Sequence, residues 1–133
     1  MQITQDDLAA LHHLRAHWAG GPDAARSSET LAHYPGRAEG RVAAWAYGRT
    51  VKALSRHARR RLHIGEGLVP SADERAVLRI ARLLGQRDWT GAESAAAWVV
   101  RRDGVAPLLD ALAPAACAAY GNALPRRKRA ATA

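Results

Sequence analysis

The chain has 133 residues, of which 48% are hydrophobic and 24% are charged, and its formal net charge is +8. This length is typical of one folded domain, and the composition argues against wholesale disorder. The single cysteine, Cys117, excludes a disulfide framework within the chain and a zinc cluster built on cysteines. We expect Cys117 to be buried as a small apolar residue.

The charge balance indicates the class of partner. A strongly basic protein is typically one that meets nucleic acid, an anionic lipid surface or an acidic protein. The first residues carry aspartate where a secretory signal would carry Lys or Arg, and no apolar run approaches the ~20 residues of a membrane span. We therefore expect a cytoplasmic protein.

Helix-start and helix-stop signals begin at the N-terminus. Thr4 can cap a first helix whose apolar residues recur at helical spacing as far as Trp18, and the Gly-Gly-Pro sequence at 20–22 ends it. A short second helix is expected at 27–33, before the proline-glycine turn at 35–36.

A third helix is predicted over residues 41–62, which form the longest helical pattern in the sequence. Its side chains separate into an apolar stripe and a basic stripe. Trp45 lies in the basic stripe, where we expect it to pack under a neighbouring helix rather than to stack on an unpaired base. The apolar stripe consists of Ala43, Ala44, Tyr47, Val51, Leu54, Ala58 and Leu62.

Capping boxes predict the next two helices. The Ser-x-x-Glu sequence at 71–74 starts a fourth helix that continues to Leu84, and the Thr-x-x-Glu sequence at 90–93 starts a fifth that continues to Arg102. Proline is well tolerated in the first turn of a helix, where its missing amide costs nothing. Two further short helices are therefore predicted, at 107–112 and at 114–120.

No segment alternates between apolar and polar residues as a strand would. The predicted fold class is all-α: a compact bundle of five to seven helices with one long central basic amphipathic helix. Residues 1–124 are expected to form a single domain. Residues 125–133 contain four consecutive basic residues and no core-sized side chain, so we expect a disordered basic C-terminal tail.

Basic residues of the third and fourth predicted helices are the candidate nucleic-acid-binding residues. No acidic residue occurs between Arg41 and Arg61, so like charges one turn apart repel each other unless an anionic partner is present. The fourth helix adds a second ridge of arginines, and we expect the two helices to share one basic surface. The candidates are Arg41, Arg49, Lys52, Arg56, Arg59, Arg60, Arg75, Arg79 and Arg82.

No pattern in the sequence predicts an enzyme. His13 and His17 are one helical turn apart, but Leu14 stands where a zinc protease helix has glutamate, so we expect polar-face histidines rather than metal ligands. The acidic pairs at 6–7 and 73–74 lie at helix starts, where capping explains them. We predict no catalytic residue, no metal and no cofactor.

The favoured function is a small helical nucleic-acid-binding protein, a DNA-binding transcriptional regulator that contacts phosphates through the basic face of helix 41–62. The alternative is a helical protein–protein interaction or regulatory module that docks on the acidic surface of a partner. A membrane partner is not expected, because the core needs the apolar face of this helix. Helical DNA binders often dimerise, so a monomer and a homodimer are both consistent with the sequence.

Overall fold

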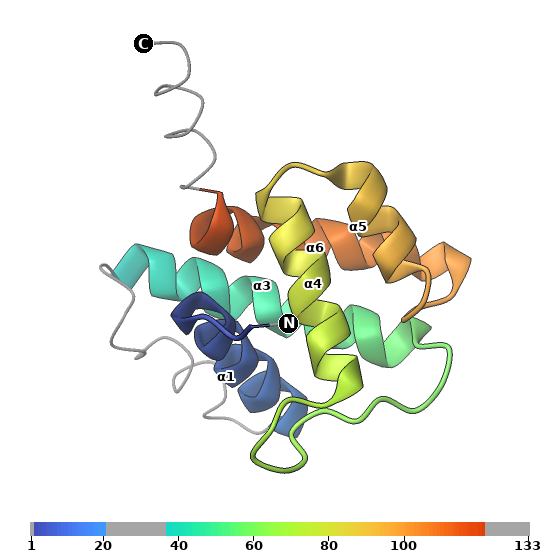
Figure 1. Cartoon of the computed structure of the whole chain (residues 1–133), viewed down its shortest axis with the longest axis horizontal. Helices are drawn as coiled ribbons and strands as arrows, with labels where there is room; N and C mark the ends of the chain where they lie inside the picture. The colour runs from blue at the N-terminus through green and yellow to red at the C-terminus, as the bar shows by residue number, and fades with distance from the viewer. Residues whose placement is uncertain (1, 21–36, 122–133) are drawn as a thin grey trace, which may run out of the picture.

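The computed structural model of the chain describes residues 2–20 and 37–121. Over these ranges the chain is all-α, as predicted, and contains no β-strand (Figure 1). The helix expected at 27–33 and the tail at 125–133 lie outside the described residues. The helices are α1 (Gln5–Ala19), α3 (Arg37–His57), α4 (Ala72–Gly85), α5 (Trp89–Ala96), the short 3-10 helix η1 (Arg102–Gly104) and α6 (Val105–Tyr120).

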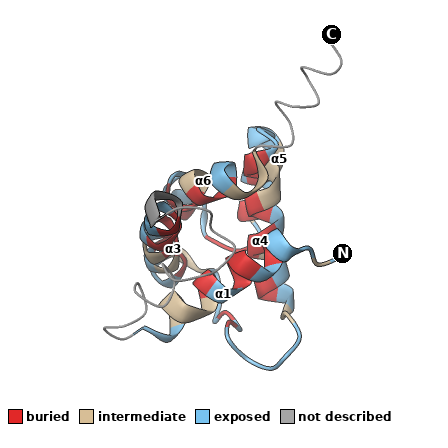
Figure 2. Ribbon diagram, turned by 90° about the vertical axis from the view of Figure 1, so that its left-hand side faces the viewer, coloured by how far each residue is buried: buried red, intermediate tan, exposed pale blue. Residues whose placement is uncertain are grey.

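The described helices enclose one apolar core. Figure 2 shows α3 and α4 on opposite sides of the molecule, with α6 above and α1 below the space between them. Each α-helix contributes buried residues to a single cluster, in which the large side chains are leucine, isoleucine, valine and tyrosine. Leu14, Leu54, Ile80, Leu108 and Leu112 are completely buried.

Two of the three predicted helix caps are confirmed. The Thr4 hydroxyl accepts a hydrogen bond from the backbone N–H of Asp7 (3.2 Å), and the Asp7 carboxylate accepts one from the backbone N–H of Thr4 (2.9 Å). Ser71 begins α4 with the same reciprocal arrangement. The third prediction is wrong, because α5 begins after Asp88, whose carboxylate accepts a hydrogen bond from the Gly91 N–H (2.9 Å).

The third predicted helix ends earlier than expected, at His57 rather than at residue 62. Ala58 leaves the helix to form an isolated antiparallel bridge with Val100. The Arg101 N–H donates to the His57 carbonyl (2.8 Å), and the Arg59 N–H donates to the Val99 carbonyl (3.1 Å). The same bridge explains why the fifth predicted helix is also too long: α5 ends at Ala96 instead of continuing to residue 102.

The last two predicted helices are one continuous helix, α6, which contains Pro114 in its interior. Proline has no N–H to donate to the carbonyl four residues earlier, which belongs to Asp110. Asp110 is exposed, so water can satisfy that carbonyl. Leu112 and Ala115 are buried on either side of the proline, and we attribute the continuity of α6 to this packing.

Candidate nucleic-acid interface

Within residues 40–57, the part of α3 whose side chains are described, four basic side chains are exposed: Arg41, Arg49, Lys52 and Arg56. At 3.6 residues per turn they fall within an arc of about 80° around the helix, and they extend over about 22 Å of its length. The side of α3 that faces the core is buried, and Leu54 is completely inaccessible there. We name these four residues the α3 stripe.

The charges of the α3 stripe are not balanced by the described part of the chain. No ion pair in that part involves any of the four residues. Lys52 and Arg56 are one helical turn apart, a spacing at which like charges destabilise a helix by a few tenths of a kcal/mol. A bound anion would remove that repulsion.

Trp45 lies in the middle of the α3 stripe, and 56% of it is exposed. The guanidinium carbon of Arg49 is 4.8 Å from the centre of a Trp45 ring, which is a cation–π contact. The expectation that Trp45 packs under a neighbouring helix is therefore wrong. Its position at the centre of the outward arc keeps it away from the core, so it adds an apolar aromatic surface to the stripe.

Arg59 and Arg60 follow the end of α3 and are held by other groups. The Arg59 Nε donates to the Ala97 carbonyl (2.6 Å). Arg60 pairs with the buried Asp73, with 3.2 Å between its Nη1 and the carboxylate Oδ2. Burial raises the pKa of Asp73, but hydrogen bonds from Arg60 and from the backbone N–H of His63 outweigh this effect and lower it overall. These contacts tie both arginines to the fold, although both residues remain exposed.

Arg82 also differs from its expected role. Its Nε donates to the Asp7 carboxylate (3.0 Å), and its Nη2 donates to the Gln2 carbonyl (2.8 Å). The Tyr120 hydroxyl donates to the same carboxylate (2.6 Å). Burial raises the pKa of Asp7, but these hydrogen bonds and those from Thr4 lower it overall. Arg82 thus joins α4 to α1 instead of facing solvent.

Arg75 and Arg79 are exposed on α4. Because α4 lies on the opposite side of the molecule from α3 (Figure 2), the two sets of arginines do not share one surface. The expected two-helix basic surface therefore separates into the α3 stripe and a distinct pair on α4.

One basic residue near α3 is missing from the sequence-based candidates. The Arg101 guanidinium donates to the carbonyl of Arg56 (2.8 Å) and to that of Ala58 (3.1 Å). It is exposed and adds a positive charge at the C-terminal end of α3, where a helix dipole favours cations. The partner carbonyls lie more than 40 residues earlier in the chain, so no local pattern indicates this contact.

The expectations for His13 and His17 as polar-face residues and for Cys117 as a buried residue differ from the structure. His13 is completely buried, and its ring stacks on that of Tyr47 with 5.3 Å between the ring centres. His17 is partly buried, which lowers its pKa. Cys117 is exposed on α6 rather than buried. Within residues 2–20 and 37–121, no cluster of three or more His, Cys, Asp or Glu is placed to hold a metal ion.

None of the helices described here combines the length and the apolar character needed to cross a membrane. Comparisons of the chain with protein-family models, with curated proteins and with solved structures find no match.

Proposed function

We propose that this chain is a DNA-binding protein that contacts the phosphates of duplex DNA through the α3 stripe and acts as a transcriptional regulator. The observation that carries the proposal is the set of four exposed basic side chains along one face of a single helix, none of which forms an ion pair with another described residue. Phosphate contacts from Lys and Arg provide most of the sequence-independent affinity of DNA-binding proteins.

The dimensions of α3 suit a duplex. The major groove is about 12 Å wide and admits an α-helix. A stripe about 22 Å long can place its first and last charges on phosphates at separate points along the groove. Arginine can hold a phosphate with two parallel hydrogen bonds, whereas Lys52 supplies a single point charge. Trp45 then meets sugars or thymine methyl groups with its exposed ring.

The primary test is a titration of a labelled duplex, a single strand and an RNA with the protein at several salt concentrations. Four phosphate contacts predict that log Kobs falls with log salt concentration with a slope of about −3.6 on a duplex. A homodimer would present two stripes and double this slope, so the same titration reports on the oligomeric state. We expect the duplex to bind most tightly.

A charge-reversal variant tests the location of the interface. We expect Arg49→Glu with Arg56→Glu to weaken duplex binding by at least about tenfold and to flatten the salt dependence. The matched control is Arg75→Glu with Arg79→Glu on α4, which changes the net charge by the same amount on the opposite side of the molecule. We expect the control to bind duplex DNA as the unmodified chain does.

Two outcomes would contradict the proposal. Equal losses in the two double variants would mean that net charge, and not the α3 stripe, attracts the DNA. Absence of binding to any of the three nucleic acids near physiological salt would favour the alternative, in which the same residues steer the protein onto an acidic protein surface.

A further inference from the structure

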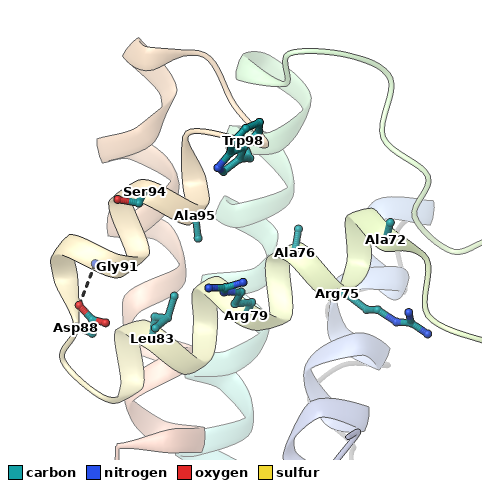
Figure 3. Close-up of a pocket in the computed structure, with 10 residues that line it drawn as sticks. All are labelled: Ala72, Arg75, Ala76, Arg79, Leu83, Asp88, Gly91, Ser94, Ala95 and Trp98. Atoms are coloured by element: carbon teal, nitrogen blue, oxygen red, sulfur yellow. Dashed lines mark hydrogen bonds between the residues drawn. The ribbon is translucent and has the colours of Figure 1, made fainter. Parts of the chain in front are cut away.

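A groove of about 580 Å³ runs between α4 and α5 (Figure 3). Ala76 of α4 and Ala95 of α5 are small residues that leave the space between the two helices unfilled, and Leu83 adds apolar surface at one end. Trp98, in the turn after α5, forms a wall of the groove, and Arg79 points into it. The groove thus combines an apolar floor with an aromatic wall and a positive charge.

Trp98 is 82% exposed, although the two residues that follow it in the chain are buried. The turn that carries it is fixed on both sides, because the Val99 N–H donates to the Ala96 carbonyl (2.9 Å) and the Arg59 N–H donates to the Val99 carbonyl (3.1 Å). Val99 and Val100 are buried in the core. The ring is therefore held outward by an ordered backbone, as the aromatic anchors of protein interfaces are.

The charged residues that line the groove have a net positive charge. Arg75 and Arg79 are exposed, stand one helical turn apart, and take part in no ion pair within the described ranges. Asp88 also lines the groove and caps α5, accepting a hydrogen bond from the Gly91 N–H, and its negative charge offsets one of the two arginines, so the lining keeps a net positive charge. An occupant of complementary charge carries carboxylates.

We propose that this groove binds an acidic amphipathic helix of a partner protein. Large apolar side chains of the partner helix fill the space above the alanines and pack against Trp98, which is the helix-in-groove mode of recognition. A carboxylate of that helix pairs with Arg79, which points into the groove, while Arg75 lies at the edge of the groove with its side chain directed away from Trp98 (Figure 3). The pair with Arg79 helps to set the register of the partner helix.

Charge and polarity distinguish this occupant from two others. A second copy of the chain also carries a net charge of +8, so its approach to the arginine pair is opposed. A nucleic acid would need polar contacts along its backbone, whereas the floor of the groove is alanine and leucine. The α3 stripe lies on the opposite side of the molecule, so this inference does not depend on the proposed function.

The probe is a fluorescein-labelled synthetic helical peptide with leucines at i, i+3, i+4 and i+7 and glutamates in the adjacent stripe. We expect Arg75→Glu with Arg79→Glu, and separately Trp98→Ala, to weaken peptide binding by at least about tenfold. The matched control is Trp89→Ala, which removes the exposed tryptophan of a different groove, between α5 and α6, and should bind the peptide normally. Circular dichroism checks that each variant is folded.

A second peptide, in which lysine replaces every glutamate, tests the charge complementarity and should not bind. NMR shift changes on adding the acidic peptide should concentrate on α4 and α5. The proposal is overturned if the acidic peptide does not bind at up to about 1 mM, if the variants bind it as the unmodified chain does, or if the shift changes fall on α3. A different result would assign the groove to nucleic acid: a single-stranded oligonucleotide displaces the peptide, and the binding of that oligonucleotide is lost in the Trp98→Ala variant. The Arg75→Glu, Arg79→Glu variant keeps the α3 stripe intact. Its binding to duplex DNA can therefore be measured separately, so a failure of the peptide-groove proposal is distinguished from a failure of the DNA-binding proposal.

Discussion

Asp7 is completely buried and accepts hydrogen bonds from three separate parts of the chain. The donors are the backbone N–H of Thr4 (2.9 Å), the Arg82 Nε (3.0 Å) and the Tyr120 hydroxyl (2.6 Å). Tyr120 is affected in turn, because burial and the hydrogen bond to Asp7 raise its pKa. One carboxylate therefore caps α1 and joins it to α4 and α6.

Asp7→Asn tests the importance of this carboxylate. The amide keeps the shape of the side chain but removes its charge and leaves the Arg82 guanidinium without its anionic partner. Breaking a buried pair in this way costs about 3 kcal/mol of the free energy of unfolding. Denaturant titration measures the loss as a lower midpoint at an unchanged m-value. The control is Asp6→Asn in the same turn, an exposed residue whose loss should cost about 0.5 kcal/mol. Equal losses in the two variants would show that a negative charge in the first turn of α1 explains the role of Asp7, without its pairing to Arg82.

Sequence patterns predict the contacts between residues that are a few positions apart, and they miss the contacts between residues that are distant in the sequence. Thr4 and its partner are three residues apart, so the capping box is visible in the sequence. Arg82 and Asp7 are 75 residues apart, and an arginine that will be tied to a buried carboxylate looks the same as one that faces solvent. The α3 stripe could be predicted because helical periodicity is local, whereas the contacts that Arg59, Arg60 and Arg82 make within the fold could not.

The packing of α4 against α6 depends on a glycine at the end of α4. A Cβ added to Gly85 would lie 2.4 Å from the Tyr120 Cβ and 2.9 Å from the Ala116 carbonyl oxygen. A Cβ added to Gly48, inside α3, would instead lie 3.5 Å from the His17 ring, an ordinary contact. The same substitution therefore has opposite consequences on two helices.

Gly85→Ala should lower the free energy of unfolding by about 1–3 kcal/mol, because α4 and α6 must separate to admit the methyl group. Gly48→Ala should raise it by about 0.5–1 kcal/mol, because alanine costs less backbone entropy than glycine in a helix interior. Thermal unfolding of the two variants beside the unmodified chain measures both signs. A stable Gly85→Ala variant would mean that α6 can shift away from α4 at little cost.

Element boundaries show the same division between local and distant causes. The start of α4 is set by Ser71 and Glu74 and was predicted correctly. The end of α3 is set by the bridge between Ala58 and Val100, two residues that have no local signal for pairing. Apolar and basic periodicity alone would let α3 continue, so its end could only be found from the position of the distant strand-like segment.

Three ion pairs between an arginine and a carboxylate connect distant parts of the chain within the described ranges. Arg82 pairs with Asp7 and Arg15 with Glu74, so two pairs join α1 to α4. Arg60 pairs with Asp73 and ties the segment after α3 to the start of α4. All three carboxylates are buried. The basic residues therefore include two groups with different roles: arginines that are neutralised by buried carboxylates and hold the bundle together, and the residues of the α3 stripe and the α4 pair, which face solvent.

Because these three carboxylates are buried and paired with arginines, the free energy of unfolding of the bundle depends on pH. Burial raises the pKa of Glu74, but hydrogen bonds from Arg15 and from the backbone of Ser71 and Gly65 lower it below its ordinary 4.5. Asp7 and Asp73 are likewise lowered below 3.8. The unfolded chain then binds protons at a higher pH than the folded chain. Their stabilisation is complete above about pH 5 and is lost as the pH falls through 4 toward the folded pKa values.

Denaturant unfolding from about pH 6 to about pH 2 measures this loss, and we expect the free energy of unfolding to fall steeply below about pH 4.5. Each carboxylate contributes a slope of up to about 1.4 kcal/mol per pH unit within its own window. Glu74→Gln should therefore be less stable near neutrality and should show a shallower fall in acid, because one of the three titrating groups is absent. Glu66→Gln is the control: it removes an exposed carboxylate that pairs with His63 at the surface (3.0 Å), and near neutrality it should cost much less stability than Glu74→Gln. If the slopes of all three proteins coincide, the buried pairs do not control acid unfolding, and the net charge of the chain becomes the better explanation.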